Sequence, residues 1–157
     1  MATQSFRANV GVVLVNSNGM VLALERCDIK YAWQMPQGGL DEGEEPLDCA
    51  WRELYEEINL TKQQAEMLRE SPTWLAYELP KEARKPKTGR GQVQKWFLFQ
   101  FAGVDSDIDL SPAHPGDEQE FCNWKWTTLR QLASETWEVR RHIYEQLITH
   151  FSSYLTE

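Results

Sequence analysis

The sequence predicts a single domain of mixed α/β class, an α+β arrangement in which a mixed β-sheet is sandwiched between α-helices. Runs of β-branched and aromatic residues follow one another mostly through turns and loops, and two stretches show helical spacing of apolar residues. This order does not fit a dinucleotide-binding sheet, whose strands alternate with helices. With 157 residues, the chain 1–157 is expected to enclose one core.

The N-terminal part is expected to form a β-hairpin. Residues 7–16 are a near-continuous apolar strand that ends at the turn signal 16–19, and a second strand is expected over 20–24. Residues 33–40 follow and contain one proline and two glycines. We expect this segment to be a loop whose backbone comes close to a ligand.

A helix is expected over 46–58, because Pro46 suits a first helical turn and five apolar residues recur at helical spacing. They are Leu47, Ala50, Trp51, Leu54 and Ile58.

The rest of the chain is expected to supply three more strands and one more helix. The strands are predicted over 73–79, 94–101 and 120–127, with a polar loop at 81–91 between the first two. A C-terminal amphipathic helix is predicted over 137–151.

Composition excludes several classes of protein. The net charge of −8 argues against binding along duplex nucleic acid, which rests on many lysine and arginine contacts to phosphates. The longest apolar run, 10–15, is far too short for a membrane span, and residues 1–9 lack the layout of a secretory signal. We therefore expect a cytoplasmic protein without a membrane partner.

The three cysteines are Cys27, Cys49 and Cys122. They are odd in number, widely scattered and without a Cys-x-x-Cys pair. We interpret them as buried or idle thiols.

Three carboxylates share one face of the predicted helix 46–58. Glu53, Glu56 and Glu57 stand at positions i, i+3 and i+4, on a face rotated away from the apolar stripe. Like charges this close require either solvation or a cation. Ligands made only of oxygen favour a hard ion, Mg²⁺ or the chemically similar Mn²⁺, and such an ion is commonly shared with substrate phosphates. The pattern therefore points to a phosphate ester or anhydride as substrate.

The spacing around these carboxylates forms a longer motif. From Gly38 the chain runs five residues to Glu44, seven more to Arg52, and then Arg-Glu-Leu-Tyr-Glu-Glu-Ile-Asn-Leu over 52–60. This segment, 38–60, resembles the Nudix box, Gly-x5-Glu-x7-Arg-Glu-U-x-Glu-Glu-x-Gly-U, where U is aliphatic. Asn59 stands where that box has glycine, and asparagine is the next most tolerant residue for a left-handed helix end. The resemblance implies the Nudix fold and metal-dependent hydrolysis of a pyrophosphate bond.

Each residue of the box has an expected role. Gly38 and Gly39 let the loop turn towards phosphates, Glu44 braces the loop, and Arg52 orients the glutamates. By the resemblance, Arg52 and the glutamates are catalytic, and the glutamates hold the metal together with Gly38. Glu57, or a carboxylate outside the box, takes the proton from the attacking water.

Segments outside the box are similar to one branch of the family. They are 6–12, 32–39, 91–97 and 120–126. That branch holds bacterial RNA 5'-pyrophosphohydrolases and plant-type asymmetric diadenosine tetraphosphate hydrolases. The similarity implies that Glu120 is a further metal-binding or catalytic carboxylate. It also implies six substrate-binding residues: Arg7, Arg26, Gln37, Gly39, Gln94 and Lys95.

The loop 81–91 is a basic island on an acidic chain. It carries five basic residues against Glu82 alone, which indicates either a solvated loop or a surface for a polyphosphate or RNA 5' end. The histidines His114, His142 and His150 lie away from the box in sequence and are expected to have surface or structural roles.

We therefore expect a pyrophosphohydrolase that removes pyrophosphate from the 5' end of triphosphorylated RNA by water attack on a phosphoanhydride. Asymmetric cleavage of diadenosine tetraphosphate, or of another dinucleoside polyphosphate, is the alternative. A catalytically silent Nudix-fold binding module is a remote third, because every carboxylate of the box is present.

Overall fold

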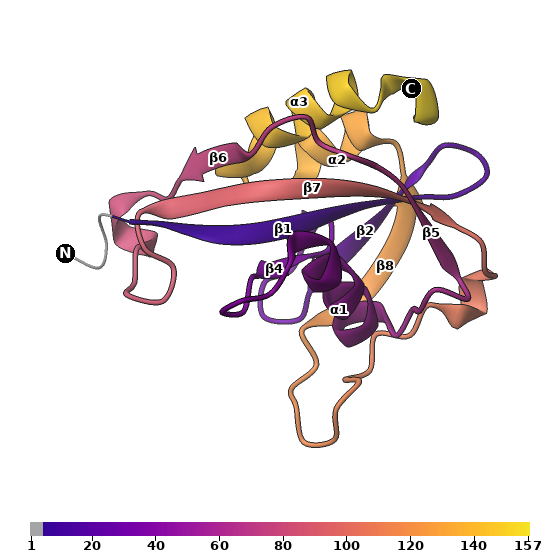
Figure 1. Cartoon of the computed structure of the whole chain (residues 1–157), viewed down its shortest axis with the longest axis horizontal. Helices are drawn as coiled ribbons and strands as arrows, with labels where there is room; N and C mark the ends of the chain where they lie inside the picture. Colours follow the sequence, from indigo (N-terminus) through magenta and orange to yellow (C-terminus); the bar gives the residue numbers. More distant parts are fainter. Residues whose placement is uncertain (1–4) are drawn as a thin grey trace.

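The computed structural model describes residues 5–157 and shows one mixed sheet with helices on both faces (Figure 1). Short 3-10 turns lie at 81–83, 105–107, 138–140 and 152–154. The main elements are β1 (Phe6–Val15), β2 (Val21–Arg26), β3 (Trp33–Gln34), β4 (Gln37–Gly39), α1 (Pro46–Ile58), β5 (Ala65–Glu70), β6 (Leu75–Glu78), β7 (Gly91–Phe101), β8 (Phe121–Thr127), α2 (Leu129–Glu135) and α3 (Arg141–His150).

The centre of the sheet is a long parallel pair, β1 and β7. They are in register from Phe6 opposite Gly91 to Val15 opposite Gln100. Every other pairing is antiparallel: β7 also pairs with β5 and β6, β1 with β2 and β4, and β2 with β3 and β8. The mixed sheet predicted from the sequence is thus confirmed.

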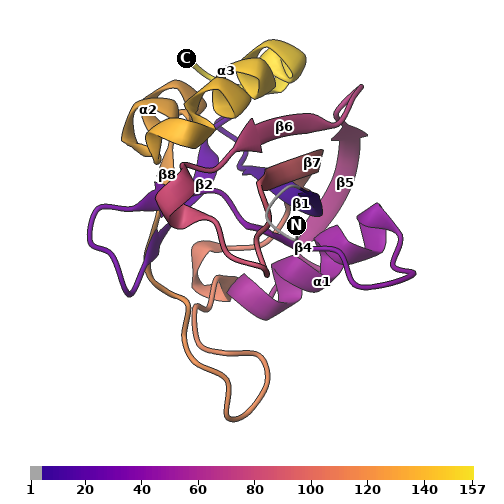
Figure 2. The ribbon, with the colours of Figure 1, turned by 90° about the vertical axis from the view of Figure 1, so that its left-hand side faces the viewer.

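Two hydrophobic cores separate the helices into layers. In Figures 1 and 2, α2 and α3 cover one face of the sheet and α1 covers the other. Alternate residues of β1 serve the two sides: Val13 and Val15 pack in the core of α2 and α3, whereas Val12 and Leu14 pack in the core of α1. The predicted sandwich follows from this alternation, because successive strand side chains point to opposite faces.

Most predicted elements are present within a few residues of their expected bounds. The helix over 46–58 is confirmed at both ends, with Pro46 in its first turn. The predicted C-terminal helix contains α3, which begins at Arg141 after a 3-10 turn.

One expectation about secondary structure was wrong, and two elements, β5 and α2, were not predicted. Segment 33–40 is not a plain loop, because β3 and β4 add short antiparallel pairings to β2 and β1. The strand β5, with the sequence AEMLRE, has few β-forming residues and is stabilised by its pairing with β7. Helix α2 has only seven residues, too few for a periodic pattern to stand out.

The expectation of idle thiols is also wrong for two of the three cysteines. Cys27 and Cys122 form a disulfide with their Cα atoms 5.0 Å apart. The two cysteines are 95 residues apart in sequence, so no local pattern indicates that the β2–β8 pairing brings them together. Cys49 is a free, buried thiol, as expected.

Within residues 5–157, each helix falls short of the length and apolarity needed to cross a bilayer.

Candidate active site

Helix α1 turns two of its three motif carboxylates inward. Glu53 and Glu57 are 7% and 6% exposed, and they are buried like Leu54 and Ile58 of the same helix. Glu56 is half-buried, with its side chain 34% exposed. Burial on this helix therefore extends beyond the apolar stripe to Glu53 and Glu57. Because these two carboxylates are buried, contact with water does not stabilise their charges.

The glycine loop lies directly against the helix at Glu53. Strand β4 pairs with β1 so that Gly38 stands opposite Val10, and a β-carbon at Gly38 would collide with the Glu53 carboxylate. Any residue larger than glycine would therefore displace the Glu53 carboxylate. A β-carbon at Gly39 would instead meet open space. The close approach expected of this segment is thus found at Gly38.

Arg52 links the loop to the carboxylates. Its Nε and Nη2 atoms donate to the two carboxylate oxygens of Glu44 over 2.8 and 2.9 Å. Nη2 also donates to the Gly39 carbonyl over 2.8 Å. Nη1 donates to Glu53 over 3.1 Å and to Glu56 over 3.2 Å. Arg52 therefore both braces the loop and orients two of the three carboxylates.

The ion pair between Arg52 and Glu44 shifts the pKa of both groups. Hydrogen bonding by Arg52 lowers the pKa of Glu44 to about 2, and the same contact raises the pKa of Arg52. A bidentate guanidinium–carboxylate pair of this kind holds its geometry well. Both groups stay charged over the whole range in which an enzyme works.

Glu57 lies deepest of the three carboxylates. Both of its oxygens are buried without a hydrogen-bond partner among the described residues. Burial raises the pKa of Glu57 well above its ordinary value, and the charges of Glu53 and Glu120 raise it further. Burial also raises the pKa of Glu53, although the Arg52 charge opposes this. Unpartnered buried carboxylates are costly, so this position favours a proton or a cation.

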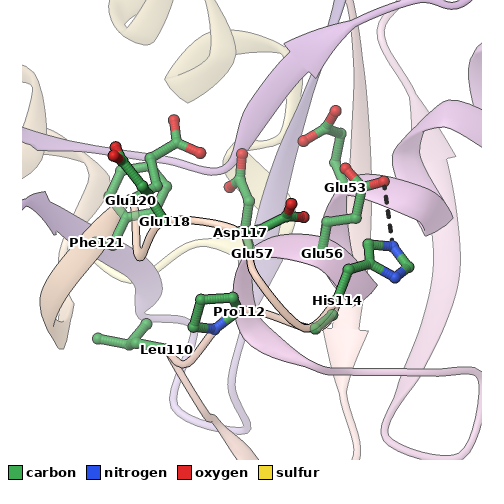
Figure 3. Close-up of a pocket in the computed structure, with 11 residues that line it drawn as sticks. Glu53, Glu56, Glu57, Leu110, Pro112, His114, Asp117, Glu118, Glu120 and Phe121 are labelled. Atoms are coloured by element: carbon green, nitrogen blue, oxygen red, sulfur yellow. Dashed lines mark ion pairs between the residues drawn. The ribbon is translucent and has the colours of Figure 1, made fainter.

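The carboxylates of α1 face a second acidic segment across a cavity of about 170 Å³. Figure 3 shows Glu53, Glu56 and Glu57 on the helix side, with acidic residues of the loop before β8 on the other side. Those loop residues are Asp117, Glu118 and Glu120. We call this cavity the acidic pocket. Burial raises the pKa of Glu120 while Arg26 lowers it.

The structure brings Glu120 to the motif, as the sequence predicts, but Asp117 and Glu118 were missed. They belong to no motif, and only the fold of the loop shows their position. Across residues 5–157, no three acidic, histidine or cysteine side chains already stand close enough together to hold a metal ion. The six carboxylates thus line one pocket without forming a finished cage.

Asn59 ends α1 and also anchors the facing loop. Its backbone has φ 59° and ψ 32°, the left-handed conformation expected for this position. Its side-chain Nδ2 donates to the carbonyls of Asp109 and Ser111, each over 2.8 Å. Glycine would allow the same turn but would have no side chain to hold the loop. This departure from the motif therefore ties the loop 109–120 to the helix.

His114 lies in the same loop and closes over the pocket. Its Nε2 atom is 3.9 Å from a Glu56 oxygen, marked by the dashed line in Figure 3, and its ring is edge-on to Tyr55. His114 lies away from the motif in sequence, but the loop folds back across α1 and brings it to the pocket. His142, by contrast, hydrogen-bonds the Ala76 carbonyl on the other side of the sheet.

A groove next to the acidic pocket carries basic residues. Arg26 forms a bidentate pair with Asp28 and lies 4.0 Å from Glu120. Lys87 lines the same groove, and its charge acts on the Glu120 carboxylate. The basic loop 81–91 therefore does reach the rim of the acidic pocket.

The remaining basic residues of the loop divide into two groups. Arg84 and Arg90 both pair with Glu78, and Arg84 also donates to the Leu79 carbonyl. These two arginines stabilise the loop. Lys81, Lys85 and Lys87 are exposed.

The other predicted substrate residues lie in different places. The backbone of Gln37 is beside Glu57, whereas Gln94 is buried and its Nε2 donates to Asn9 over 2.9 Å and to Gln37 over 3.3 Å. The Gln94 carbonyl oxygen in turn accepts from the Trp96 indole. Gln94 therefore influences the pocket through its hydrogen bond to Gln37.

Arg7 and Lys95 stand apart from the acidic pocket. Arg7 donates to the Pro86 carbonyl over 2.7 Å and so supports the basic loop. Lys95 lies 3.8 Å from Glu70, in a separate cleft that the start of α1 and β5 line.

A mixed sheet between helices, with a glycine loop and a carboxylate-bearing helix at its edge, defines the Nudix class of fold. The chain belongs to the Nudix family, since the model of the NUDIX domain matches residues 5–147. Members of this family hydrolyse phosphoanhydrides and generally use divalent metal ions.

Relatives with high identity span nearly the whole chain. An RNA pyrophosphohydrolase of Rhodospirillum rubrum is 42% identical over 152 residues, covering 95% of this chain and 88% of that protein. Nudix hydrolase 26, chloroplastic, of Arabidopsis thaliana is 40% identical and covers 97% of this chain and 72% of that protein. A C. elegans Ap4A hydrolase structure matches with a TM-score of 0.69 at 22% identity, over 94% of this chain and 98% of the other, which shows a shared fold.

We predict that Asn59→Gly keeps the helix end but frees the loop. The loss of two partly exposed hydrogen bonds should lower the free energy of unfolding by about 1 kcal/mol and speed hydrogen exchange across 109–120. Asn59→Asp, which cannot donate to the carbonyls, should free the loop in the same way. Unchanged exchange in both variants would show that the anchor is unimportant.

We also predict that the metal-free protein loses stability as pH rises. Glu53 and Glu57 have raised pKa values in the folded state. Their contribution to the free energy of unfolding is therefore fully present below the unfolded pKa of 4.5, and it falls as pH rises through the folded pKa values. Glu44 has the opposite sign, and its contribution is lost only as pH falls from 4.5 towards about 2. In EDTA, Tm should therefore fall between about pH 5 and 8.

The matched variant for this measurement is Glu57→Gln, which removes one of the carboxyl groups with a raised pKa. Its Tm in EDTA should fall less steeply with pH than that of the native protein. Equal slopes would show that Glu57 does not titrate in this range.

Proposed function

We propose that this protein is a cytoplasmic RNA 5'-pyrophosphohydrolase that uses Mg²⁺, or Mn²⁺, to remove pyrophosphate from triphosphate-ended RNA. The observation that carries the proposal is the 42% identity to an RNA pyrophosphohydrolase over 152 residues, combined with an acidic pocket lined by the three helix carboxylates of the motif. Relatives with the same printed name recur at 37–39% identity over nearly the full chain.

The pocket fits a hard divalent cation. Its donors are carboxylate oxygens, and the buried, unpartnered oxygens of Glu57 favour a positive charge beside them. The residues that would hold the ion are Glu53, Glu56, Glu57 and Glu120, with the carbonyl of Gly38. A bound Mg²⁺ supplies neutralisation of phosphate charge and lowers the pKa of nearby water. An incomplete cage suits Mg²⁺, which keeps several waters and binds substrate phosphates as well.

The protein's own groups supply a base and its positioning. Glu57 has a raised pKa, so its carboxylate is a stronger base than an ordinary glutamate and is suited to accept a proton from the attacking water. Glu120 faces it across the pocket with a pKa that is also raised. Arg52 holds Glu53 and Glu56 in place, and water attack then breaks one phosphoanhydride bond.

The rim is proposed to hold the nucleotide part of the substrate. Arg26 and Gln37 stand beside the pocket, and Gly39 lies in the loop that Arg52 braces. Gln94 positions Gln37, and Arg7 supports the basic loop. Substrate-binding roles are proposed for all of these residues. Lys95 is proposed to contact only the part of a long substrate that extends towards the start of α1.

The deciding experiment compares triphosphate-ended RNA with diadenosine tetraphosphate and identifies the products. We expect pyrophosphate release from the RNA with the higher kcat/KM, no turnover in excess EDTA, and recovery with Mg²⁺ or Mn²⁺. A clear preference for the dinucleotide would assign the chain to the alternative activity, and full turnover in EDTA would remove the metal from the mechanism. Binding without turnover of either substrate would favour a silent module.

We predict that Glu57→Gln folds normally but loses at least about two decades of kcat, roughly 2.7 kcal/mol of transition-state stabilisation. The melting temperature in EDTA should not fall, because a costly buried charge has been removed. Asp48→Asn is the matched control, since Asp48 is an exposed acid on the same helix. A Glu57→Gln enzyme as active as this control would exclude Glu57 from the chemistry.

We predict that Lys85→Ala together with Lys87→Ala weakens the capture of long RNA more than of diadenosine tetraphosphate. Long strands offer more phosphates, and the loss should appear in kcat/KM and shrink as salt screens charges beyond about 8–10 Å. Arg84 and Arg90 are left unchanged because they stabilise the loop. Lys62→Ala with Arg130→Ala removes the same charge away from the groove. Equal losses in both double variants would indicate a general charge effect.

A further inference from the structure

The disulfide lies at an irregularity in the sheet beside the acidic pocket. In the β2–β8 pairing, Glu25 stands opposite Asn123 and Arg26 opposite Phe121. Cys122 is therefore the extra residue of a β-bulge, and Cys27 follows directly after the last paired residue of β2. Bulges commonly redirect side chains at the edge of a site. Here the bulge places two sulfur atoms within bonding distance.

The bond joins two segments of the rim. Cys27 begins the loop 27–32, which also carries Asp28, the partner of Arg26. Cys122 follows Glu120 by two residues, and the Cys27 backbone N–H donates to the Glu120 carbonyl over 3.0 Å. The covalent link thus holds the surroundings of Arg26 and Glu120 together. Without it, the strand pairing of Arg26 with Phe121, one backbone hydrogen bond and an ion pair at 4.0 Å would connect them.

The disulfide is open to solvent. Cys27 and Cys122 are both exposed, and Cys27 lines the wide groove beside Glu120. A thiol reagent can therefore reach the bond directly. Cys49 is different: it is buried against the Gly39 carbonyl, and burial raises its pKa to about 12, which makes it unreactive.

We propose that Cys27 and Cys122 form a reversible thiol–disulfide modification site that controls how firmly the rim holds substrate. In the oxidised form the bond clamps the loop 27–32 to the strand after Glu120. A dithiol reductant opens it by attack on one sulfur: the S–S bond takes up two electrons and two protons, and the reductant closes to its own disulfide. In the reduced form the loop is tethered only by non-covalent contacts.

Reduction of the disulfide should weaken the capture of substrate, measured as kcat/KM, and should leave the chemical step, measured as kcat, little changed. The helix carboxylates and Arg52 make no contact with either cysteine, so reduction leaves them in place, whereas Arg26 and the Glu120 backbone lose a fixed neighbour. This part of the inference rests on the proposed function, because it assumes that the rim binds substrate. The redox chemistry itself does not depend on it.

The first measurement needs no substrate. The full chain, oxidised in air, should show one thiol per molecule on titration after unfolding, and three after reduction by dithiothreitol, with a mass gain of two hydrogens. Reduction should speed hydrogen exchange in 27–32 and lower Tm by about 5 °C or more, since the bond closes a long loop. Three thiols after oxidation, or a bond that resists dithiothreitol in the folded protein, would overturn the proposal.

The second measurement compares kinetics of the oxidised and reduced protein on triphosphate-ended RNA. We expect reduction to lower kcat/KM about two- to fivefold, the factor an exposed ion pair commonly supplies, with kcat at saturation little changed. The variant Cys27→Ser with Cys122→Ser should match the reduced protein and ignore dithiothreitol. Cys49→Ala should keep the same ratio between oxidised and reduced forms.

These two measurements separate the possible failures. If the thiol counts and exchange behave as expected but neither RNA nor diadenosine tetraphosphate is cleaved, the proposed function fails while the redox site stands. If the RNA is cleaved equally by the oxidised, reduced and doubly substituted proteins, control of capture is refuted and the bond is a structural staple.

Discussion

The Arg52 guanidinium holds together parts of the site that would otherwise separate. It pairs with Glu44 and reaches the Gly39 carbonyl and two helix carboxylates at the same time. Because its donors form a rigid planar fork, these contacts fix angles as well as distances. The glycine loop and helix α1 therefore keep one relative position, and the acidic pocket has a defined wall.

The opposite wall of the pocket depends on a quite different kind of contact. Loop 109–120 is joined to α1 by the side chain of Asn59 and by the approach of His114 to Glu56. These contacts are few and partly exposed, so this wall should move more easily than the helix wall. One rigid and one adjustable wall suit the proposed reaction, in which the pocket closes around phosphates and then releases a product.

The rim separates recognition from chemistry. Glu57 is buried, and its carboxylate oxygens have no hydrogen-bond partner among the described residues. Lys87 and the Cys27–Cys122 bond are instead exposed at the groove outside the pocket. Changes at the rim can thus alter which substrate is held without disturbing Glu57, the proposed proton acceptor. In the proposed mechanism, exposed groups select the substrate and buried groups supply the rate.

The sequence alone was enough to identify the single mixed domain, helix 46–58 and the carboxylates of the motif, because helical periodicity and fixed spacing are local properties of the chain. It also anticipated the left-handed end at Asn59. Only the tertiary structure showed that Glu53 and Glu57 are buried, and that loop 109–120 brings acidic residues and a histidine to the pocket. The disulfide likewise depends on a strand pairing between distant segments. Such proximities arise from packing and strand register, which no local pattern of residues encodes.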